Sequence, residues 1–186
     1  MKKFELTSET KINIFGKKLF RIKALISFAD VEAGETGGWV EKEGNVNQSG
    51  DAWVSGNAEV SGNAKVYGNA KVYGDAWVSG NAEVYGNAKV SGNAWVSGNA
   101  KVYGDAWVSG DAEVYGNADY TTIHGFGTQF RTTTFFRCKD KKVRVACGCF
   151  FGTIPEFREQ VKNTRKGKIA EEYLMIADLM EKHFEK

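Results

Sequence analysis

The chain has 186 residues, of which 42% are hydrophobic and 22 are glycine, and its formal net charge is +2 at pH 7. This composition predicts a single compact unit, alone or with a small appendage. It argues against a membrane span, because no apolar run approaches the ~20 residues that cross a bilayer, and against a signal peptide, because no apolar stretch follows Met1.

The first 37 residues are expected to form an N-terminal β cap. Strand-like runs at 11–15 and 19–26 flank Gly16, a pattern typical of a hairpin, and a loose repeat starts at Gly38-Trp39-Val40. A cap is needed because a short solenoid otherwise exposes open strand edges and core at its ends.

Residues 38–121 are predicted to form a parallel β-helix. Between positions 50 and 116 a glycine falls at every sixth residue, followed by Asn or Asp, Ala, a variable residue, Val, and Ser or Tyr. A strict period of this length is typical of a β-helix whose core forms only when coils stack. In the hexad 80–85, alternation sends Ala82 and Val84 inward and their neighbours outward. Gly80 makes the corner, because glycine accepts positive φ freely.

This pattern resembles the hexapeptide-repeat proteins, whose left-handed parallel β-helix has three hexads per coil. The resemblance implies left-handed winding and about four regular coils, which would place residues 18 apart in columns. The outward columns then read Lys65, Glu83, Lys101, Asp119 on one face, Glu59, Trp77, Trp95, Glu113 on the second and Trp53, Lys71, Lys89, Trp107 on the third.

Aromatic side chains on these faces are the candidate binding residues. Large apolar groups on a flat outer face usually mark an interface, although cross-strand packing is the simpler explanation. Self-association as a dimer or trimer is the first expectation, and a protein or sugar partner is the second. The candidates are Trp53, Trp77, Trp95, Trp107, Tyr67, Tyr85 and Tyr103.

Residues 122–186 are predicted to form a small α+β domain. Runs at 130–138 and 143–151 alternate about a turn at 139–142, which indicates a hairpin. We expect one of its faces to carry Phe130, Phe136, Cys138, Val143, Val145, Cys147 and Cys149. Thr153 and Glu156 have the spacing of a capping box, so a helix should follow to about residue 164. A second helix is expected at 169–184, with Tyr173, Ile176, Ala177 and Met180 on one apolar face.

Catalytic chemistry has little support in the sequence. Hexapeptide-repeat proteins include CoA-dependent acyltransferases that use a histidine as general base, and His124 is the only credible base here. A zinc site from Cys138, Cys147, Cys149 and His124 is conceivable, but reduced core thiols explain these cysteines better. Their small, odd number favours a reducing cytoplasm. We therefore expect no metal, no cofactor and no enzyme activity.

The whole chain also looks like a group of proteins common in phages and prophages. The residues that carry this resemblance are KLFRIKAL at 18–25, GGWVE at 37–41 and CGCFFGT at 147–153 followed by Glu156-Phe157. The resemblance implies an intracellular β-helix and no particular chemistry. The resulting hypothesis is a non-enzymatic, homo-oligomeric binding protein that occupies or inhibits a host component, for example a defence system. A structural polymer is a further alternative. The C-terminal end is basic, but charges of both signs alternate there, so a nucleic-acid partner is not expected.

Overall fold

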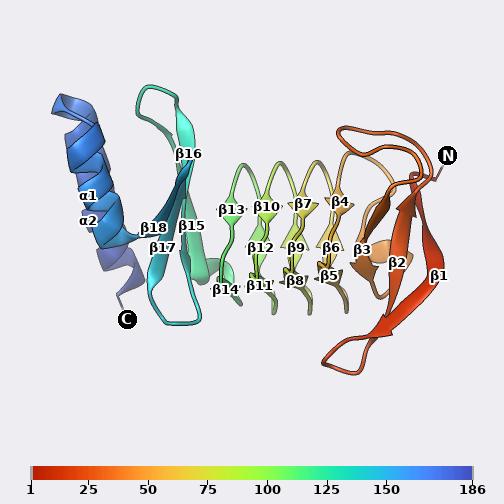
Figure 1. Ribbon diagram of the computed structural model, residues 1–186. Helices are drawn as coiled ribbons and strands as arrows, with labels where there is room; N and C mark the ends of the chain where they lie inside the picture. Colours follow the sequence, from red (N-terminus) through yellow and green to blue (C-terminus); the bar gives the residue numbers. More distant parts are fainter. Residues whose placement is uncertain (1, 186) are drawn as a thin grey trace.

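The computed structural model describes residues 2–185 and shows a parallel β-solenoid with a cap at each end (Figure 1). An antiparallel hairpin lies at the N-terminal end, a stack of short strands forms the middle, and an antiparallel sheet covered by two helices closes the C-terminal end. The fold is therefore mainly β, as the repeat predicts, with the expected α+β segment after the last coil. In the described residues, no helix is long and apolar enough to cross a membrane.

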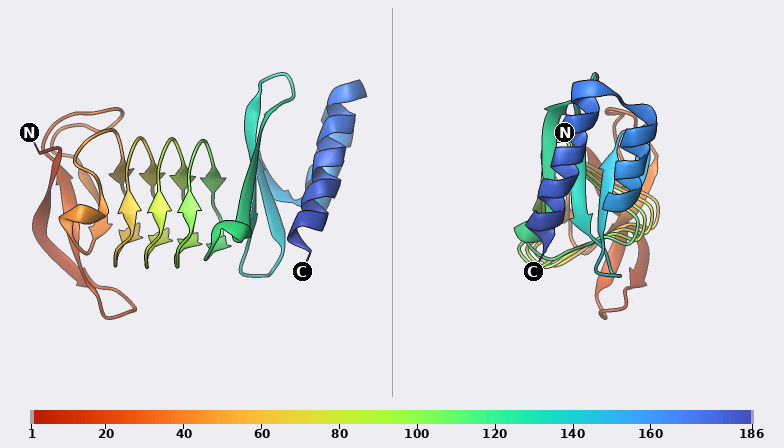
Figure 2. Two further views of the ribbon diagram at one scale, coloured as in Figure 1. Left: turned by 180° about the vertical axis from the view of Figure 1, so that it is seen from behind. Right: turned by 90° about the vertical axis from the view of Figure 1, so that its left-hand side faces the viewer.

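The solenoid has three sheets of two-residue strands. The right-hand view of Figure 2 looks roughly along the solenoid, with the C-terminal helices in front. One sheet contains β5 (Glu59–Val60), β8 (Trp77–Val78), β11 (Trp95–Val96) and β14 (Glu113–Val114). The second contains β4 (Trp53–Val54), β7 (Lys71–Val72), β10 (Lys89–Val90) and β13 (Trp107–Val108). The third contains β6 (Lys65–Val66), β9 (Glu83–Val84) and β12 (Lys101–Val102).

Strand pairing confirms the predicted column spacing. Trp77 pairs with Glu59 and Trp95, and Lys89 pairs with Lys71 and Trp107. The column that begins at Lys65 is shorter than expected, because Asp119 lies in a 3-10 turn, η2 (Asn117–Asp119), and accepts hydrogen bonds from the Tyr115 and Gly116 amides.

The repeat residues take the roles that their chemistry predicts. Every Ala and Val from Ala52 to Val114 is at most 1% exposed, so the solenoid interior is a continuous column of small apolar side chains. Gly80 adopts φ +66°, and a Cβ there would lie 3.0 Å from the backbone nitrogen of Gly98 in the next coil. Glycine at this corner thus supplies both the left-handed conformation and the close approach of successive coils.

The N-terminal cap extends the first sheet. β1 (Phe4–Ile12) and β2 (Lys18–Ala24) form the expected hairpin around Gly16, although the first strand begins at Phe4 rather than at Lys11. β2 pairs with β3 (Thr36–Val40), and β3 pairs in parallel with β5. A 3-10 turn, η1 (Glu43–Asn45), leads into the first coil.

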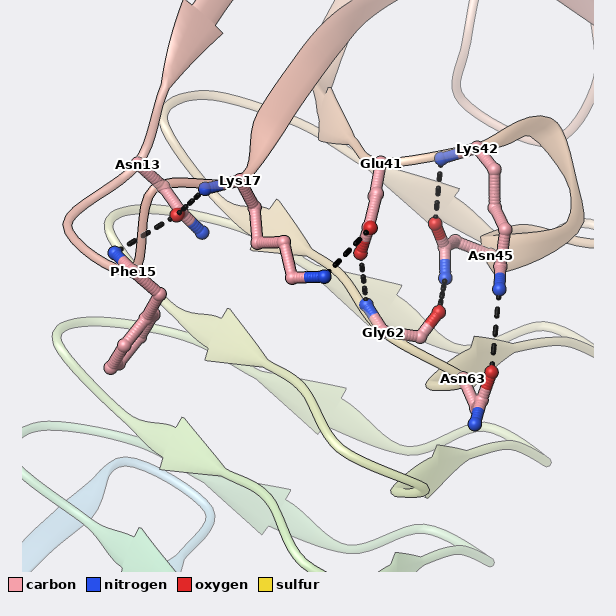
Figure 3. A network of polar contacts seen from close by, with 8 residues as sticks. All are labelled: Asn13, Phe15, Lys17, Glu41, Lys42, Asn45, Gly62 and Asn63. Atoms are coloured by element: carbon pink, nitrogen blue, oxygen red, sulfur yellow. Dashed lines mark hydrogen bonds and ion pairs between the residues drawn. The ribbon is translucent and has the colours of Figure 1, made fainter.

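The two caps supply the backbone hydrogen-bond partners that the first and last coils of the solenoid lack. Backbone bonds between coils run from an N–H to a carbonyl of the following coil, as from Trp53 to Ala70 (3.0 Å). The first coil therefore needs donors and the last needs acceptors. At the N-terminal end the Asn45 amide donates to the carbonyls of Gly62 (3.2 Å) and Ala64 (2.9 Å), as Figure 3 shows for Gly62.

Lys3 supplies hydrogen-bond donors to the corner of the solenoid at Gly50. Its ammonium donates to the carbonyls of Gly50 (3.1 Å) and Ala52 (2.8 Å), and the residue is 2% exposed. At the other end, Thr134 Oγ1 accepts from the Trp107 amide at 3.0 Å. Side chains of the caps thus satisfy strand edges that would otherwise pair with another chain.

The C-terminal cap is a four-stranded antiparallel sheet backed by two helices (Figure 1). Its strands are β15 (Tyr120–Phe126), β16 (Arg131–Arg137), β17 (Val143–Cys147) and β18 (Phe150–Thr153). The helices are α1 (Ile154–Thr164) and α2 (Gly167–Phe184). The capping box is confirmed, with Thr153 Oγ1 accepting from the Glu156 amide at 3.4 Å and Glu156 Oε2 accepting from the Thr153 amide at 2.7 Å. Tyr173, Ile176, Ala177 and Met180 are all buried.

The predicted hairpin exists, but its predicted single apolar face is wrong. Phe136, Cys138 and Ala146 close the core of the solenoid, whereas Phe135 and Val145 pack on the opposite side against the helices. The register pairs Phe135 with Val145, which places Phe136 and Val145 on different faces. Of the three thiols expected in the core, only Cys138 is buried. Cys147 is half-buried, Cys149 is exposed, and Phe130 is 66% exposed.

The division into three segments at residues 37 and 121 stays a prediction. β3 starts at Thr36 and β15 runs from Tyr120 to Phe126, so strands extend across both predicted boundaries. The solenoid core also continues into both caps without a break.

Candidate functional site: an aromatic surface beside the solenoid

The tryptophans of the first sheet form the centre of the candidate site. Trp77 and Trp95 are adjacent in the ladder, with ring centroids 5.8 Å apart and planes at 77°. Tyr115 contacts Trp95 edge-on at 5.8 Å. Their columns place these rings side by side because each coil repeats after three hexads.

The tip of the N-terminal hairpin covers part of this aromatic group. The Phe15 ring lies 5.5 Å from that of Trp77 and 5.7 Å from that of Trp95. Its neighbours Ile12 and Ile14 are 65% and 74% exposed, and Phe15 itself remains 50% exposed. We call these six residues the aromatic surface: Ile12, Ile14, Phe15, Trp77, Trp95 and Tyr115.

A set of polar contacts holds the hairpin tip in place, as Figure 3 shows. Asn13 Oδ1 accepts hydrogen bonds from the amides of Phe15 (3.0 Å) and Lys17 (2.9 Å). Lys17 pairs with Glu41 at 3.3 Å, and Glu41 in turn accepts from the Gly62 amide at 2.6 Å. This amide hydrogen bond is the largest cause of the lowered pKa of Glu41, ahead of Lys17. The apolar tip is therefore anchored to the first coil.

A groove of about 640 Å³ runs along the tryptophan face. Its floor is aromatic, and its rim carries charges of both signs. Lys11 on the hairpin pairs with Glu59 at 2.8 Å, and Lys11 Nζ lies 4.6 Å from the ring of Trp39. The rim residues are Lys11, Asn57, Glu59, Asp75, Asn93, Asp111, Glu113 and Lys139.

The predicted tyrosines form a separate stack on the third sheet. Tyr67 and Tyr85 lie parallel with centroids 4.8 Å apart, and Tyr85 and Tyr103 follow at 5.3 Å. Burial raises the pKa of Tyr67 to about 12, and its hydrogen bond to Glu83 (2.8 Å) acts in the same direction. These rings mainly pack on one another, as cross-strand pairs do, and lie on a different sheet from Trp77 and Trp95.

Two of the predicted aromatic residues differ from expectation. Trp53 is 4% exposed, because Phe28 from the loop after β2 packs on it at 5.4 Å and Phe4 lies 6.2 Å away. It is a core residue of the N-terminal cap and cannot contact a partner at the surface. Trp107 is half-buried beside the C-terminal cap, and its Nε1 donates to Ser91 Oγ at 3.2 Å.

His124 lies on β15 of the C-terminal cap and not on the solenoid sheets that carry Trp77, Trp95 and the tyrosine stack. It is exposed, and its Nδ1 lies 3.0 Å from Thr132 Oγ1. It is not among the residues that line the tryptophan groove. Among residues 2–185, no group of three or more His, Cys, Asp or Glu side chains is arranged to hold a metal ion.

Sequence reasoning missed the apolar tip formed by Ile12, Ile14 and Phe15. A signal was available, because apolar residues flanking the tight turn at Gly16 are unusual in a solvent-exposed hairpin. Their contact with Trp77 could not be read from spacing, since it depends on how far the hairpin reaches along the solenoid.

The three ladders, the glycine corners and the small apolar core define a parallel β-solenoid repeat protein. A comparison with protein families agrees, matching residues 64–80 and 82–98 to the YdcK beta solenoid repeat. Both matched stretches lie within the regular coils; the first contains Trp77 and the second contains Trp95. A search of curated proteins finds no match.

Proposed function

We propose that this chain is a non-enzymatic β-solenoid binding scaffold that self-associates through the aromatic surface. The observation that carries the proposal is the apolar hairpin tip, where Ile12, Ile14 and Phe15 are each at least half exposed while their backbone is anchored to the solenoid. A monomer gains little from exposing such a group, and rigid apolar residues beside aromatic rings are typical of interface centres.

A second copy of the chain is the partner that fits this surface best. A two-fold interface brings a patch against itself, so its rim must be able to pair with its own charges. The groove rim supplies Lys11 and Lys139 together with Glu59, Asp75, Asp111 and Glu113, and Lys11 already pairs with Glu59 of its own chain. In the proposed interface, rotation of the second copy sets lysines of one rim against carboxylates of the other, around an apolar centre.

The resemblance to phage-type proteins supports a narrower proposal. On that basis the assembled scaffold acts in the cytoplasm of a host and occupies a host component, which makes inhibition of a defence system the most concrete form of the hypothesis. No residue of the solenoid is assigned to that contact. A host protein that binds the aromatic surface would compete with self-association.

Sedimentation velocity over a range of protein concentrations tests the scaffold proposal. The wild type is expected to form a dimer or trimer, and Phe15→Ser and Ile14→Ser are expected to shift it to monomer. Leu179→Ser is the matched control, because Leu179 is 58% exposed on α2 and lies outside the aromatic surface. A wild type that stays monomeric at high concentration, or an assembly that Phe15→Ser leaves intact, would rule the proposal out.

An acyltransferase is the rival class, and acetyl-CoA titration by calorimetry separates the two. The scaffold proposal expects no saturable heat. Saturable binding that His124→Ala abolishes would instead assign the chain to that enzyme class.

A further inference from the structure

The C-terminal cap contains a second cavity, far from the aromatic surface. It has a volume of about 130 Å³ and lies between the sheet and the two helices. Its wall includes Phe150 and Phe157, both of which pack in the core between sheet and helices. Apart from Gly127 and Val161, the remaining lining is polar and contains no carboxylate. Its polar residues include Thr128, Gln129, Arg131, Gln160, Arg165 and Tyr173.

Two arginines from different elements meet at this cavity. Arg131 starts β16, and Arg165 directly follows α1. Elsewhere in the cap, arginines have acidic partners: Arg144 pairs with Asp140, and Arg158 pairs with Asp178 and Glu181. Among the ion pairs of residues 2–185, neither Arg131 nor Arg165 has a carboxylate partner.

The backbone around Arg131 is shaped to accept its guanidinium. Gly148, in the turn between β17 and β18, has φ +61°, and a Cβ there would lie 2.2 Å from Arg131 Nη1. Only glycine therefore allows the guanidinium to lie against this turn. This placement puts one positive group at the cavity wall.

Tyr173 lines the same cavity as the two arginines. Its hydroxyl donates to the carbonyl of Phe126 at 3.1 Å, which places the phenol under the loop that begins at Gly127. Burial raises the pKa of Tyr173, whereas the positive charges of Arg165 and Arg131 act to lower it. Both arginines thus act on the charge of the same phenol and line the same cavity.

We propose that this cavity binds a phosphate group held between Arg131 and Arg165. The planar guanidinium fork matches phosphate oxygens in a bidentate manner. A phosphate monoester carries close to two negative charges at pH 7, which balances two arginines that have no acidic partner. The hydroxyls and amides of Thr128, Gln129 and Gln160 supply further donors, and the Phe150 and Phe157 rings suit a small apolar substituent. This site is independent of self-association through the aromatic surface.

Calorimetric titration of the full chain with phenyl phosphate and with inorganic phosphate tests the proposal. Saturable 1:1 binding is expected for at least one of them. Tighter binding of phenyl phosphate would identify an organic monoester as the ligand, and equal binding would identify free phosphate. Benzoate, which has the ring but a single charge, is expected to bind at least tenfold more weakly than phenyl phosphate.

Charge-removing variants then locate the site. Arg131→Gln and Arg165→Gln should each weaken binding by about 10- to 100-fold, because each removes charge-assisted hydrogen bonds to the ligand. Arg131→Lys, which keeps the charge without the fork, should fall between the wild type and Arg131→Gln. Lys182→Gln is the matched control, since it loses the same charge on the exposed side of α2, outside the cavity lining.

Thermal melts of each variant establish that the cap remains folded. The proposal is overturned if neither phosphate compound binds saturably, if Lys182→Gln weakens binding as much as the arginine variants do, or if benzoate binds as tightly as phenyl phosphate.

Discussion

Replacing Asn45 by Asp tests the idea that the N-terminal cap works by supplying hydrogen-bond donors. Asn45 is fully buried, its Nδ2 donates to the Gly62 and Ala64 carbonyls, and its Oδ1 accepts from the Lys42 amide at 2.9 Å. Aspartate has the same shape but replaces the donor by an oxygen. The variant keeps the contact to Lys42 and loses both contacts to the first coil.

The cost follows from what is left unpaired. The Ala64 carbonyl is buried, and losing its hydrogen-bond donor costs about 1–3 kcal/mol. The loss at the Gly62 carbonyl is smaller, because that contact is only part-buried. A buried aspartate anion that faces two carbonyl oxygens adds a further cost. We expect Asn45→Asp to lower the free energy of unfolding by about 2–5 kcal/mol at pH 7. The loss should be smaller near pH 4. The folded-state pKa of the new carboxyl lies above its unfolded value of about 3.9, so stability falls as pH rises through that window.

Urea unfolding followed by circular dichroism at pH 4 and pH 7 measures both effects. Asn99→Asp is the matched control, because Asn99 is an exposed corner residue whose side chain accepts from Asn81 and donates no hydrogen bond within residues 2–185. It should change stability by less than about 0.5 kcal/mol. A loss below about 1 kcal/mol for Asn45→Asp, or a loss that does not depend on pH, would refute the donor role.

Three further predictions concern the core, the buried lysine and the helix cap. Val84→Asp should prevent cooperative folding, because it buries an unpaired carboxylate in the narrow core. The control Lys89→Asp changes an exposed residue and should leave the thermal unfolding curve nearly unchanged. Burial lowers the folded-state pKa of Lys3 from 10.5 to about 8. Between those pH values the unfolded chain binds more protons at Lys3 than the folded chain does. The free energy of unfolding contributed by this group therefore rises with pH in that range. The unfolding free energy of Lys3→Met should lack this rise, and equal pH slopes for the two proteins between pH 8 and 10 would contradict the assignment. Thr153→Ala should lower the stability of the C-terminal cap by about 1 kcal/mol in thermal unfolding, with Thr153→Ser close to wild type.

The solenoid could be predicted from the sequence because each hexad specifies the same local structure. The glycine corner, the inward Ala82 and Val84 and the outward residues between them repeat without insertion. With three hexads per coil, as the resemblance implies, the same repeat gives the column order of Trp77 and Trp95. The start of α1 was equally local, since the Thr153 capping box lies within four residues of sequence. The start of α2 has no side-chain cap, and the helix begins at Gly167 rather than at the expected residue 169.

The errors arose where packing depends on distant segments. Phe135 and Phe136 are adjacent and both fully buried, because the C-terminal sheet is covered on one face by the solenoid and on the other by helices. Alternation cannot assign faces in such a sheet. Trp53 was expected outside because its repeat position is outward, but Phe28 from the N-terminal cap covers it.

The same limit applies to function. The two arginines at the cap cavity are separated by more than thirty residues, and Phe15 is far in sequence from Trp77. No spacing rule connects either pair. Both sites became visible only when the hairpin tip and the cap loops were placed against the elements they contact.

Hydroxyl-radical footprinting of dilute and concentrated protein tests the central claim most directly, because it locates the surface that becomes covered on assembly. The scaffold account predicts that Ile12, Ile14, Phe15, Trp77 and Trp95 become protected at high concentration. Met175, which is 63% exposed on α2, should stay equally reactive throughout. Protection of Met175 with an unchanged hairpin tip would contradict the account and place the interface on the C-terminal helices.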